Sequence, residues 1–326
     1  METKILSAAD VDVAAETLKN GGLVAIPTET VYGLAGDAMR GEIVRKIYEA
    51  KGRPSDNPLI VHIAKIEDVF RVSDDVPEAF FALAEKFMPG PLTVVVPKGK
   101  AVPYEVTGGG ETVAVRMPSH PLARAVIERS GCLLAAPSAN VSKHVSPTTA
   151  KHVYDDLDGK IPYILDGGEC GVGIESTVVS VVTDVPTVLR PGFITAEMLG
   201  EVLGEVKNFE GKVIKTAPAP GMKYKHYAPR CEAALAANAS AAVRLYEAAN
   251  GDGKNPVILA YGDNKKRYGS LNVIDLGDTP ADAAHRIYAA LREAEDKFGY
   301  IIVDKIPDGG LASSVMNRIL KATANE

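Results

Sequence analysis

A proline-rich interruption in the second half of the chain limits the folds that the whole chain can adopt. Residues 216–229 read T-A-P-A-P-G-M-K-Y-K-H-Y-A-P. Proline has no backbone N–H and a fixed φ, so this stretch can form neither a continuous helix nor a central strand. The 326 residues are also more than one domain usually holds, at roughly 150 residues per domain. We predict two domains, at 1–207 and 231–326, joined by a linker at 208–230.

Short apolar stretches and helical stretches are mixed along the first domain. Ser7 and Asp10 have the spacing of a capping box at a helix start. Strands mixed with helices predict an α/β domain, and strands that follow one another directly argue against a purely parallel sheet. We expect strands at 23–26, 59–63, 92–96, 113–116, 133–136, 163–165 and 177–182, and helices at 11–18, 42–50, 77–87, 121–129 and 149–156.

The second domain shows the same mixture on a smaller scale. Residues 279–298 carry apolar side chains every three or four positions, which predicts a long amphipathic helix. Apolar stretches at 256–260, 271–276 and 300–304 predict strands. The sequence thus predicts a small α/β domain of three or four strands.

Charge and cysteine content exclude some classes of protein. Lys and Arg number 36 against 42 Asp and Glu, a net charge of −6, whereas proteins that hold nucleic-acid phosphates usually carry a basic surplus. Cys132, Cys170 and Cys231 form no C-x-x-C pair, which suits a reducing cytoplasm. No apolar run approaches the roughly 20 residues that span a bilayer, and the first residues do not resemble a signal peptide. We expect a cytoplasmic protein without a membrane segment.

Standard nucleotide and hydrolase motifs are missing. There is no G-x-x-x-x-G-K-[ST], G-x-S-x-G or H-E-x-x-H, and the glycines at 171–173 do not continue as a dinucleotide fingerprint. Any phosphate site must therefore be built differently. In K-G-R-P-S-D-N-P-L-I-V-H, residues 51–62, prolines stiffen a loop in which Lys51 and Arg53 could grip phosphate oxygens. Alternatively, Lys51 and Arg53 are basic residues at a helix C-terminus that offset the helix dipole. His62 could likewise be a buried core histidine without a role in binding.

Four other segments place polar groups at the ends of predicted strands. Residues 27–35 combine threonine, glutamate and tyrosine, and either face a ligand or cap a following helix through a threonine. Arg116 ends a strand and needs an anionic partner, either a substrate carboxylate or a structural Asp or Glu. Residues 135–149 either wrap a phosphate or base, or cap the next helix through Ser146 or Thr148. The glycines at 166–177 either approach a ligand or form a turn.

The order of these segments resembles one known family. The motifs along the chain are P-T-E-T-V-Y-G-L, K-x-R-P-x-x-N-P-L, P-G-P-x-T, R-x-P-x-H, P-S-A-N-x-S, S-P-T-T, G-x-E-S-T-V and L-R-P-G. Across residues 1 to about 205, the chain resembles the YrdC-like family in the sequence and order of these motifs. The segment P-G-M-K-Y-K-H-Y-A-P and the residues after it resemble the longer, two-domain members. Lys143 departs from the pattern, because the family commonly has glycine there.

This resemblance implies a fold and an activity. The fold would be a twisted mixed α/β sheet with a concave pocket, plus a smaller C-terminal α/β domain. The activity would be that of a nucleotidyltransferase, L-threonylcarbamoyladenylate synthase. The amine of L-threonine takes up bicarbonate as a carbamate, the carbamate attacks the α-phosphate of ATP, and pyrophosphate leaves, with Mg²⁺ accompanying ATP. The product would serve tRNA N6-threonylcarbamoyladenosine modification through a separate transferase complex, and tight tRNA binding is not expected.

The resemblance also assigns roles to single residues. Lys51 and Arg53 would be the catalytic cations, and no motif identifies metal ligands. Tyr227 on the linker would close over the nucleotide and exclude water. L-threonine would be surrounded by Thr30, His62, Arg116, the backbone at Ala136, and Ser176. ATP would be surrounded by Lys51, Arg53, Asn57, Thr112, Ser138, Asn140, Ser146, Arg190 and Tyr227.

Two other functions fit parts of the pattern. An RNA-binding module would use the basic loop, but the acidic total and the lack of interleaved aromatic and basic residues disfavour it. Carbamoyl transfer onto another acceptor would keep the fold, but the larger relatives that carry a similar domain have cysteine-rich metal sites, which this sequence lacks. For the C-terminal domain we expect a role in positioning the linker.

Overall fold

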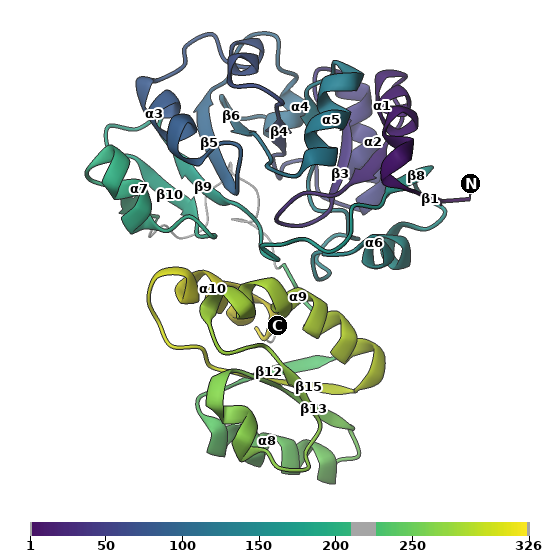
Figure 1. Ribbon diagram of the computed structural model, residues 1–326, viewed down its shortest axis with the longest axis vertical. Helices are drawn as coiled ribbons and strands as arrows, with labels where there is room; N and C mark the ends of the chain where they lie inside the picture. Colours follow the sequence, from purple (N-terminus) through teal and green to yellow (C-terminus); the bar gives the residue numbers. More distant parts are fainter. Residues whose placement is uncertain (1, 210–225, 325–326) are drawn as a thin grey trace. The chain divides into compact units, whose positions relative to one another are not determined.

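The strands of the described residues form two sheets, and each sheet belongs to a separate unit (Figure 1). The structure is a computed structural model that describes residues 2–209 and 226–324. The predicted linker at 208–230 lies mostly outside these residues. The first unit comprises Met1–Ser142, Pro147–Gly171 and Glu175–Tyr224, and the second comprises Lys143–Ser146, Val172–Ile174 and Lys225–Glu326.

The first unit contains a mixed sheet, which confirms the predicted fold class. Its strands are β1 (Lys4–Leu6), β2 (Val24–Ile26), β3 (Gly33–Asp37), β4 (Ile60–His62), β5 (Leu92–Pro97), β6 (Thr112–Arg116), β7 (Leu134–Ala135), β8 (Tyr163–Leu165), β9 (Thr177–Ser180), β10 (Thr187–Arg190) and β11 (Lys207–Asn208). Their spatial order is β1-β8-β2-β3-β7-β4-β6-β5-β9-β10-β11. β4 runs parallel to β6 and β5 parallel to β9, whereas β5 and β6 are antiparallel. The central strands therefore combine both directions.

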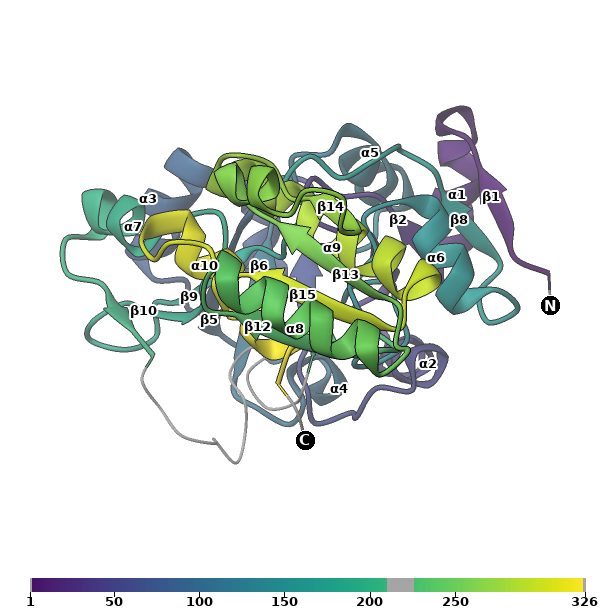
Figure 2. The same cartoon turned by 90° about the horizontal axis from the view of Figure 1, so that it is seen from below.

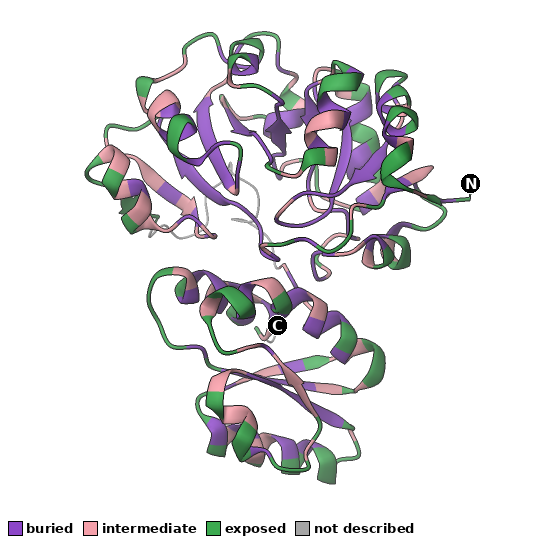
Figure 3. Cartoon of the chain, in the orientation of Figure 1, coloured by how far each residue is buried: buried purple, intermediate pink, exposed green. Residues whose placement is uncertain are grey.

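Helices cover both faces of this sheet, because successive strand residues point to opposite sides. In β2, Val24 and Ile26 pack in a cluster with α1 and α5, while Ala25 belongs to the cluster that includes α2 and α3. The strands between these layers are buried (Figure 3). The helices of this unit are α1 (Val11–Lys19), α2 (Gly41–Lys51), α3 (Glu78–Phe87), α4 (Tyr104–Thr107), α5 (Pro121–Ser130), α6 (Ala150–Leu157) and α7 (Ala196–Leu203).

The second unit contains a parallel four-stranded sheet. The strands β12 (Glu232–Ala236), β13 (Pro256–Ala260), β14 (Val273–Asp275) and β15 (Tyr300–Asp304) lie in the order β12-β15-β13-β14. The helices are α8 (Ala239–Gly251), α9 (Pro280–Lys297) and α10 (Gly310–Ala322). Helix α8 packs against β12, β13 and β15, in front of the strands in Figure 2, and α9 packs beside α10. None of the helices in the described ranges is both long and apolar enough to cross a membrane.

The long helix predicted at 279–298 is confirmed as α9, and its start explains why. Thr279 caps the helix by accepting the amide of Asp282, and Asp282 in turn accepts the backbone N–H of Thr279. Pro280 occupies the first helical position, where its missing N–H costs nothing. Capping box, proline and apolar periodicity thus agree on this helix.

The second unit also takes in two short segments that we expected in the first domain. Residues 143–146 and 172–174 are far from residue 231 in the sequence but cluster with the C-terminal part of the chain. The physical reason is their set of contacts with α9, which are described below.

Candidate active site

The loop after β2 is closed by its own hydroxyl groups. Thr28 Oγ1 accepts the amides of Thr30 and Val31 at 3.2 Å each, donates to the carbonyl of Val31 at 2.6 Å and lies 2.9 Å from Thr30 Oγ1. Both threonines are buried. The alternative that one of them caps a following helix is wrong, because the chain continues into strand β3. The loop is therefore a rigid turn beside the sheet.

Arg116 forms a buried ion pair with the carboxylate of this loop. Arg116 Nη2 donates to Glu29 Oε1 at 2.7 Å, and the other oxygen of Glu29 accepts the amide of Ser119 at 3.1 Å. We considered a substrate carboxylate or a structural Asp or Glu as the partner of Arg116, and in the structure a protein carboxylate, that of Glu29, is present. Arg116 Nε is buried and has no hydrogen-bond partner in the structure, so this guanidinium retains a donor for a further anion.

His62 lies next to Arg116, because the two residues are register partners on the parallel strands β4 and β6. His62 is buried, and its Nδ1 lies 3.2 Å from the carbonyl of Ile60. Burial, reinforced by the positive charge of Arg116, lowers the pKa of His62 to about 3. The imidazole is therefore neutral at physiological pH, as in a satisfied core histidine, and it leaves Arg116 as the cation at this strand end.

Ser176, which immediately precedes β9, contacts Arg190 at the end of β10. Arg190 donates through Nε to the carbonyl of Ser176 and through Nη2 to its hydroxyl, both at 3.1 Å. The hydroxyl of Thr93 on β5 lies 2.7 Å from that of Ser176. Because Val94 is the register partner of Val115, Thr93 lies at the same strand end as Arg116. The predicted threonine residues His62, Arg116 and Ser176 thus gather at one end of the central strands.

Lys51 ends helix α2, and its ammonium supports the loop after β7. Gly52 adopts the left-handed conformation (φ 60°) that ends the helix at this point. Lys51 Nζ is buried and donates to the carbonyls of Ser138 and Asn140 at 2.5 and 2.6 Å. Burial lowers the pKa of Lys51 well below its usual range, and nearby Arg53 adds to this. Lys51 thus holds the predicted nucleotide loop in place.

Arg53 and Asn57 form the turn that leads into β4. Arg53 Nη2 donates to the carbonyl of Pro58 at 3.1 Å and lies 3.4 Å from that of Asn57. Asn57 is buried, and its Oδ1 has no hydrogen-bond partner in the structure. Thr112 begins β6, whose register with β4 places this residue at the end nearer Asn57. The predicted nucleotide residues Asn57 and Thr112 therefore lie at the end of these strands opposite His62 and Arg116.

The segment after β7 continues past Ile60 toward the strand end nearer Asn57, because β7 runs antiparallel to β4. The amide of Ala136 donates to the carbonyl of Ile60 at 3.2 Å, and Ser138 bridges to Gly33. A side chain at Gly33 would approach Ala136 Cβ to 3.1 Å, so glycine permits this close contact. The first unit therefore brings Thr30, Ala136, Ser138 and Asn140 beside the same central strands.

Two predicted residues belong to the second unit instead. Ser146 is buried, and Tyr227 stacks on Tyr288 of α9 with ring centroids 5.3 Å apart. Thr149, rather than Ser146 or Thr148, caps α6 by accepting the amide of His152. The capping alternative for Ser146 is therefore wrong.

Glu29 and Thr93 contact the predicted site residues Arg116 and Ser176, although we assigned them no role from the sequence. Both stand inside quoted motifs, P-T-E-T-V-Y-G-L and P-G-P-x-T. Buried carboxylates and hydroxyls need hydrogen-bond partners. The polar residues inside these motifs could therefore have indicated that Glu29 and Thr93 contact other polar side chains. A separate cavity of about 380 Å³ in the first unit is lined by Lys65, Arg71 and Cys132 among others, and by none of the predicted site residues.

Known proteins are similar to this chain over nearly its full length. A family model named for Sua5, YciO and YrdC, described as telomere recombination, matches residues 16–192, and a model described as the C-terminal domain of threonylcarbamoyl-AMP synthase matches residues 194–324. The threonylcarbamoyl-AMP synthases of Pyrococcus abyssi and Bacillus subtilis are each 44% identical over 95% of this chain, and 93% and 91% of their own lengths are covered. The structure of P. abyssi Sua5 complexed with L-threonine has a TM-score of 0.92 at 40% identity, covering 99% of this chain and 98% of that one.

Proposed function

Because this chain belongs to the Sua5/YrdC family of threonylcarbamoyl-AMP synthases, we propose that it makes L-threonylcarbamoyladenylate from L-threonine, bicarbonate and ATP. The amine of threonine adds to bicarbonate, water leaves, and a carbamate remains. A carbamate oxygen then attacks the α-phosphorus of ATP, the bond to the bridging oxygen breaks, and pyrophosphate leaves. Positioning and charge neutralisation are enough for such a step, without a covalent enzyme intermediate.

The guanidinium of Arg116 is the observation that carries the proposal. Glu29 holds the guanidinium in position, and Nε is left to donate a hydrogen bond to a ligand. His62 beside it is neutral, so it adds no second positive charge. Arg binds carboxylates with directional N–H groups, so the carboxylate of L-threonine suits this position. The hydroxyl of Ser176, held by Thr93 and Arg190, offers a polar group at the same strand end.

The opposite strand end suits the nucleotide. Asn57 Oδ1 is a buried acceptor without a partner, and an adenine amino group or a ribose hydroxyl can donate to it. Arg53 would offset charge on the departing pyrophosphate. Lys51 would hold Ser138 and Asn140 and, in its protonated form, act as a cation, which a nearby triphosphate would favour against the lowering of its pKa by burial. Thr112 at this strand end, Arg190 beside Ser176 at the other end, and Ser146 and Tyr227 are proposed to complete the nucleotide site.

We propose Mg²⁺ as a companion of ATP and not as a protein-held ion. Magnesium commonly keeps several waters and binds through substrate phosphates. The described residues contain no group of three His, Cys, Asp or Glu side chains placed to hold a metal, so they form no cage for it. When bound, Mg²⁺ would neutralise phosphate charge, and no step above depends on a protein ligand to it.

The cellular role follows from the product. An acyl adenylate of this kind is prone to hydrolysis, so we place the enzyme directly ahead of the transferase that modifies tRNA adenosine. The three scattered cysteines suit a reducing compartment and support the cytoplasm as its location. Hand-over to that transferase requires no tight binding of tRNA by this chain.

Pyrophosphate release with each amino acid in turn, with and without bicarbonate, tests the proposed function. We expect release to require L-threonine, bicarbonate and ATP together. Release that is indifferent to the amino acid or to bicarbonate would disprove it. Filter binding of tRNA across salt concentrations tests the RNA-binding alternative, since phosphate contacts make binding steeply salt-dependent.

A further inference from the structure

Helix α9 contacts three separate segments of the chain within the second unit. The contacts involve Ala284, Tyr288, Arg292 and Glu295, which we call the α9 stripe. These positions are three or four residues apart, so they share one face of the helix. Each contacted segment contains, or leads directly into, a residue that the proposed function assigns to a substrate.

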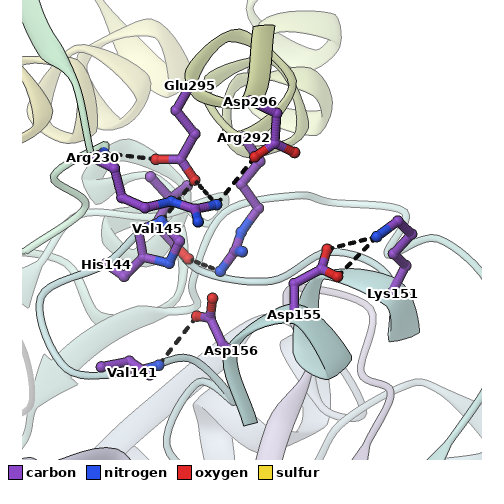
Figure 4. A network of polar contacts seen from close by, with 10 residues as sticks. All are labelled: Val141, His144, Val145, Lys151, Asp155, Asp156, Arg230, Arg292, Glu295 and Asp296. Atoms are coloured by element: carbon purple, nitrogen blue, oxygen red, sulfur yellow. Dashed lines mark hydrogen bonds and ion pairs between the residues drawn. The ribbon is translucent and has the colours of Figure 1, made fainter. Parts of the chain in front are cut away.

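The first segment is residues 143–146, which ends at Ser146. Arg292 Nη2 donates to the carbonyl of Val145 at 2.5 Å, and Glu295 Oε1 lies 2.7 Å from His144 Nε2. Glu295 also accepts the amide of Arg230 at 2.7 Å (Figure 4). These contacts fix the main chain immediately before Ser146.

The charge on Glu295 is part of this arrangement. Its side chain has no exposed surface, and burial alone would raise its pKa. Hydrogen bonds from His144 and Arg230 instead hold the pKa of Glu295 below its ordinary value. Buried charges add little net stability, but they define geometry, because each needs its partners in place. Glu295 and Arg292 thus specify where residues 143–146 lie.

The second segment is residues 172–174, which leads to Ser176. Gly173 has φ +81° and packs against the α9 backbone. A Cβ at this position would lie 2.4 Å from the carbonyl oxygens of both Ala284 and His285. Only glycine permits this approach, so the backbone of α9 sets the path of the chain three residues before Ser176.

The third segment holds Tyr227, which has the left-handed φ of 67°. A bulky residue in this region is strained and persists only where its surroundings hold it. Tyr288 of the α9 stripe stacks on its ring at an interplanar angle of 28°, and Arg318 lies 5.9 Å from the ring centroid. The strained residue is therefore fixed by α9 and α10.

We propose that α9 is the positioning element for substrate binding: Arg292 and Glu295 position Ser146, and the backbone at Ala284 and His285 positions the segment that leads to Ser176. The inference rests on the proposed function, which assigns Ser146 to ATP and Ser176 to L-threonine. It gives the C-terminal domain a direct part in substrate affinity, beyond positioning a linker.

Two variants of the full chain separate the effects on the two substrates. Glu295→Gln keeps the shape of the side chain and removes its charge, so we expect the KM for ATP to rise about tenfold with kcat nearly unchanged, as for loss of a coupled positioning contact. Gly173→Ala should raise the KM for L-threonine to a similar extent, about tenfold, with less effect on ATP. Arg292→Lys, which keeps the charge but loses the planar guanidinium, should resemble Glu295→Gln.

Amide hydrogen exchange reads the same contacts without depending on activity. We expect faster exchange at residues 142–149 in Glu295→Gln and at 171–177 in Gly173→Ala. Glu293→Gln, on the exposed side of the same helix, should match the wild type in KM and exchange. Gly171→Ala, where a Cβ meets nothing within 4 Å, should leave the exchange of 171–177 unchanged.

The outcomes distinguish the two levels of inference. A folded wild-type protein that releases no pyrophosphate with threonine, bicarbonate and ATP disproves the proposed function, whatever the variants do. An active wild type whose Glu295→Gln variant equals Glu293→Gln in KM and exchange overturns the role of α9. If the KM values for ATP and L-threonine rise equally in the variants, in proportion to the fall in melting temperature, α9 has a purely structural role, and the proposal is also overturned.

Discussion

Glu29 and Arg116 are joined across 87 positions of sequence by a 2.7 Å ion pair whose side chains are only 12% and 5% exposed. Removing one partner from such a pair leaves the other charge buried and uncompensated. The pair therefore links the stability of the first unit to the amino-acid end of the proposed site.

Glu29→Ala should lower the free energy of unfolding by roughly 3–5 kcal/mol, because Arg116 would lose its buried partner. Urea denaturation measures this change. The control is Glu128→Ala, since Glu128 lies 3.8 Å from Arg124 in an exposed pair whose loss should cost under about 1 kcal/mol. Equal effects of the two substitutions would contradict the importance of the buried pair.

Arg53→Ala should reduce turnover on the order of 10²-fold, as loss of one preorganised cation can. Lys51→Met should reduce turnover as much and, in addition, lower the unfolding free energy by about 1–3 kcal/mol, since the carbonyls of Ser138 and Asn140 lose a charged donor. Pyrophosphate release and urea denaturation measure the two effects. Lys46→Met, on the same helix, serves as the control. Near-normal turnover of Arg53→Ala would show that its assignment is wrong.

His62 should make the protein less stable in acid. Its pKa is about 3 when folded and about 6.5 in an unfolded chain, so below pH 6.5 the unfolded state binds a proton that the folded state does not. The unfolding free energy should therefore fall on acidification from pH 6.5 towards 3, by up to about 1.4 kcal/mol per pH unit from this residue. The stability advantage of wild type over His62→Asn should shrink between pH 7 and pH 5. Parallel pH curves for the two proteins would count against a buried neutral imidazole.

Lys143→Gly should stabilise the protein. Lys143 has φ 75°, in the left-handed region where a side chain costs roughly 1 kcal/mol relative to glycine. Lys143→Ala keeps the Cβ and hence the strain, so the glycine variant should exceed it by about 0.5–1 kcal/mol in thermal or urea unfolding. An alanine variant as stable as the glycine variant would mean that the left-handed conformation is not strained here.

Elements with a strong local signal were predictable. The strands at 163–165, 256–260 and 300–304 match their predicted bounds, because continuous apolar runs are bounded there by breaking residues. The strands β3 (G-L-A-G-D) and β12 (E-A-A-L-A) were not predicted, since glycine and alanine are both less common in strands than β-branched and aromatic residues. Their pairing with β2 and β7, and with β15, overrides the local preference.

Which segments build the site could be inferred from the sequence, but not which residues pair within it. From the sequence, either a substrate carboxylate or a structural Asp or Glu could have been the partner of Arg116. Only the fold shows that Glu29, 87 positions away, lies against it. The contact of Lys51 with Asn140 spans 89 positions, and that of Arg292 with Val145 spans 147. Such pairings depend on the topology of the sheet and of the second unit, and no local pattern encodes them.

The contact between Gly173 and α9 has a consequence for synthesis on the ribosome. Residues 172–174 leave the ribosome roughly a hundred residues before His285, which at about 5–20 residues per second is a delay of roughly 5–20 seconds. During this interval the first unit can fold, but the loop that leads to Ser176 has no helix to pack against. If α9 positions the substrate-binding segments as proposed, the nascent chain can fold its first unit before the substrate site is complete.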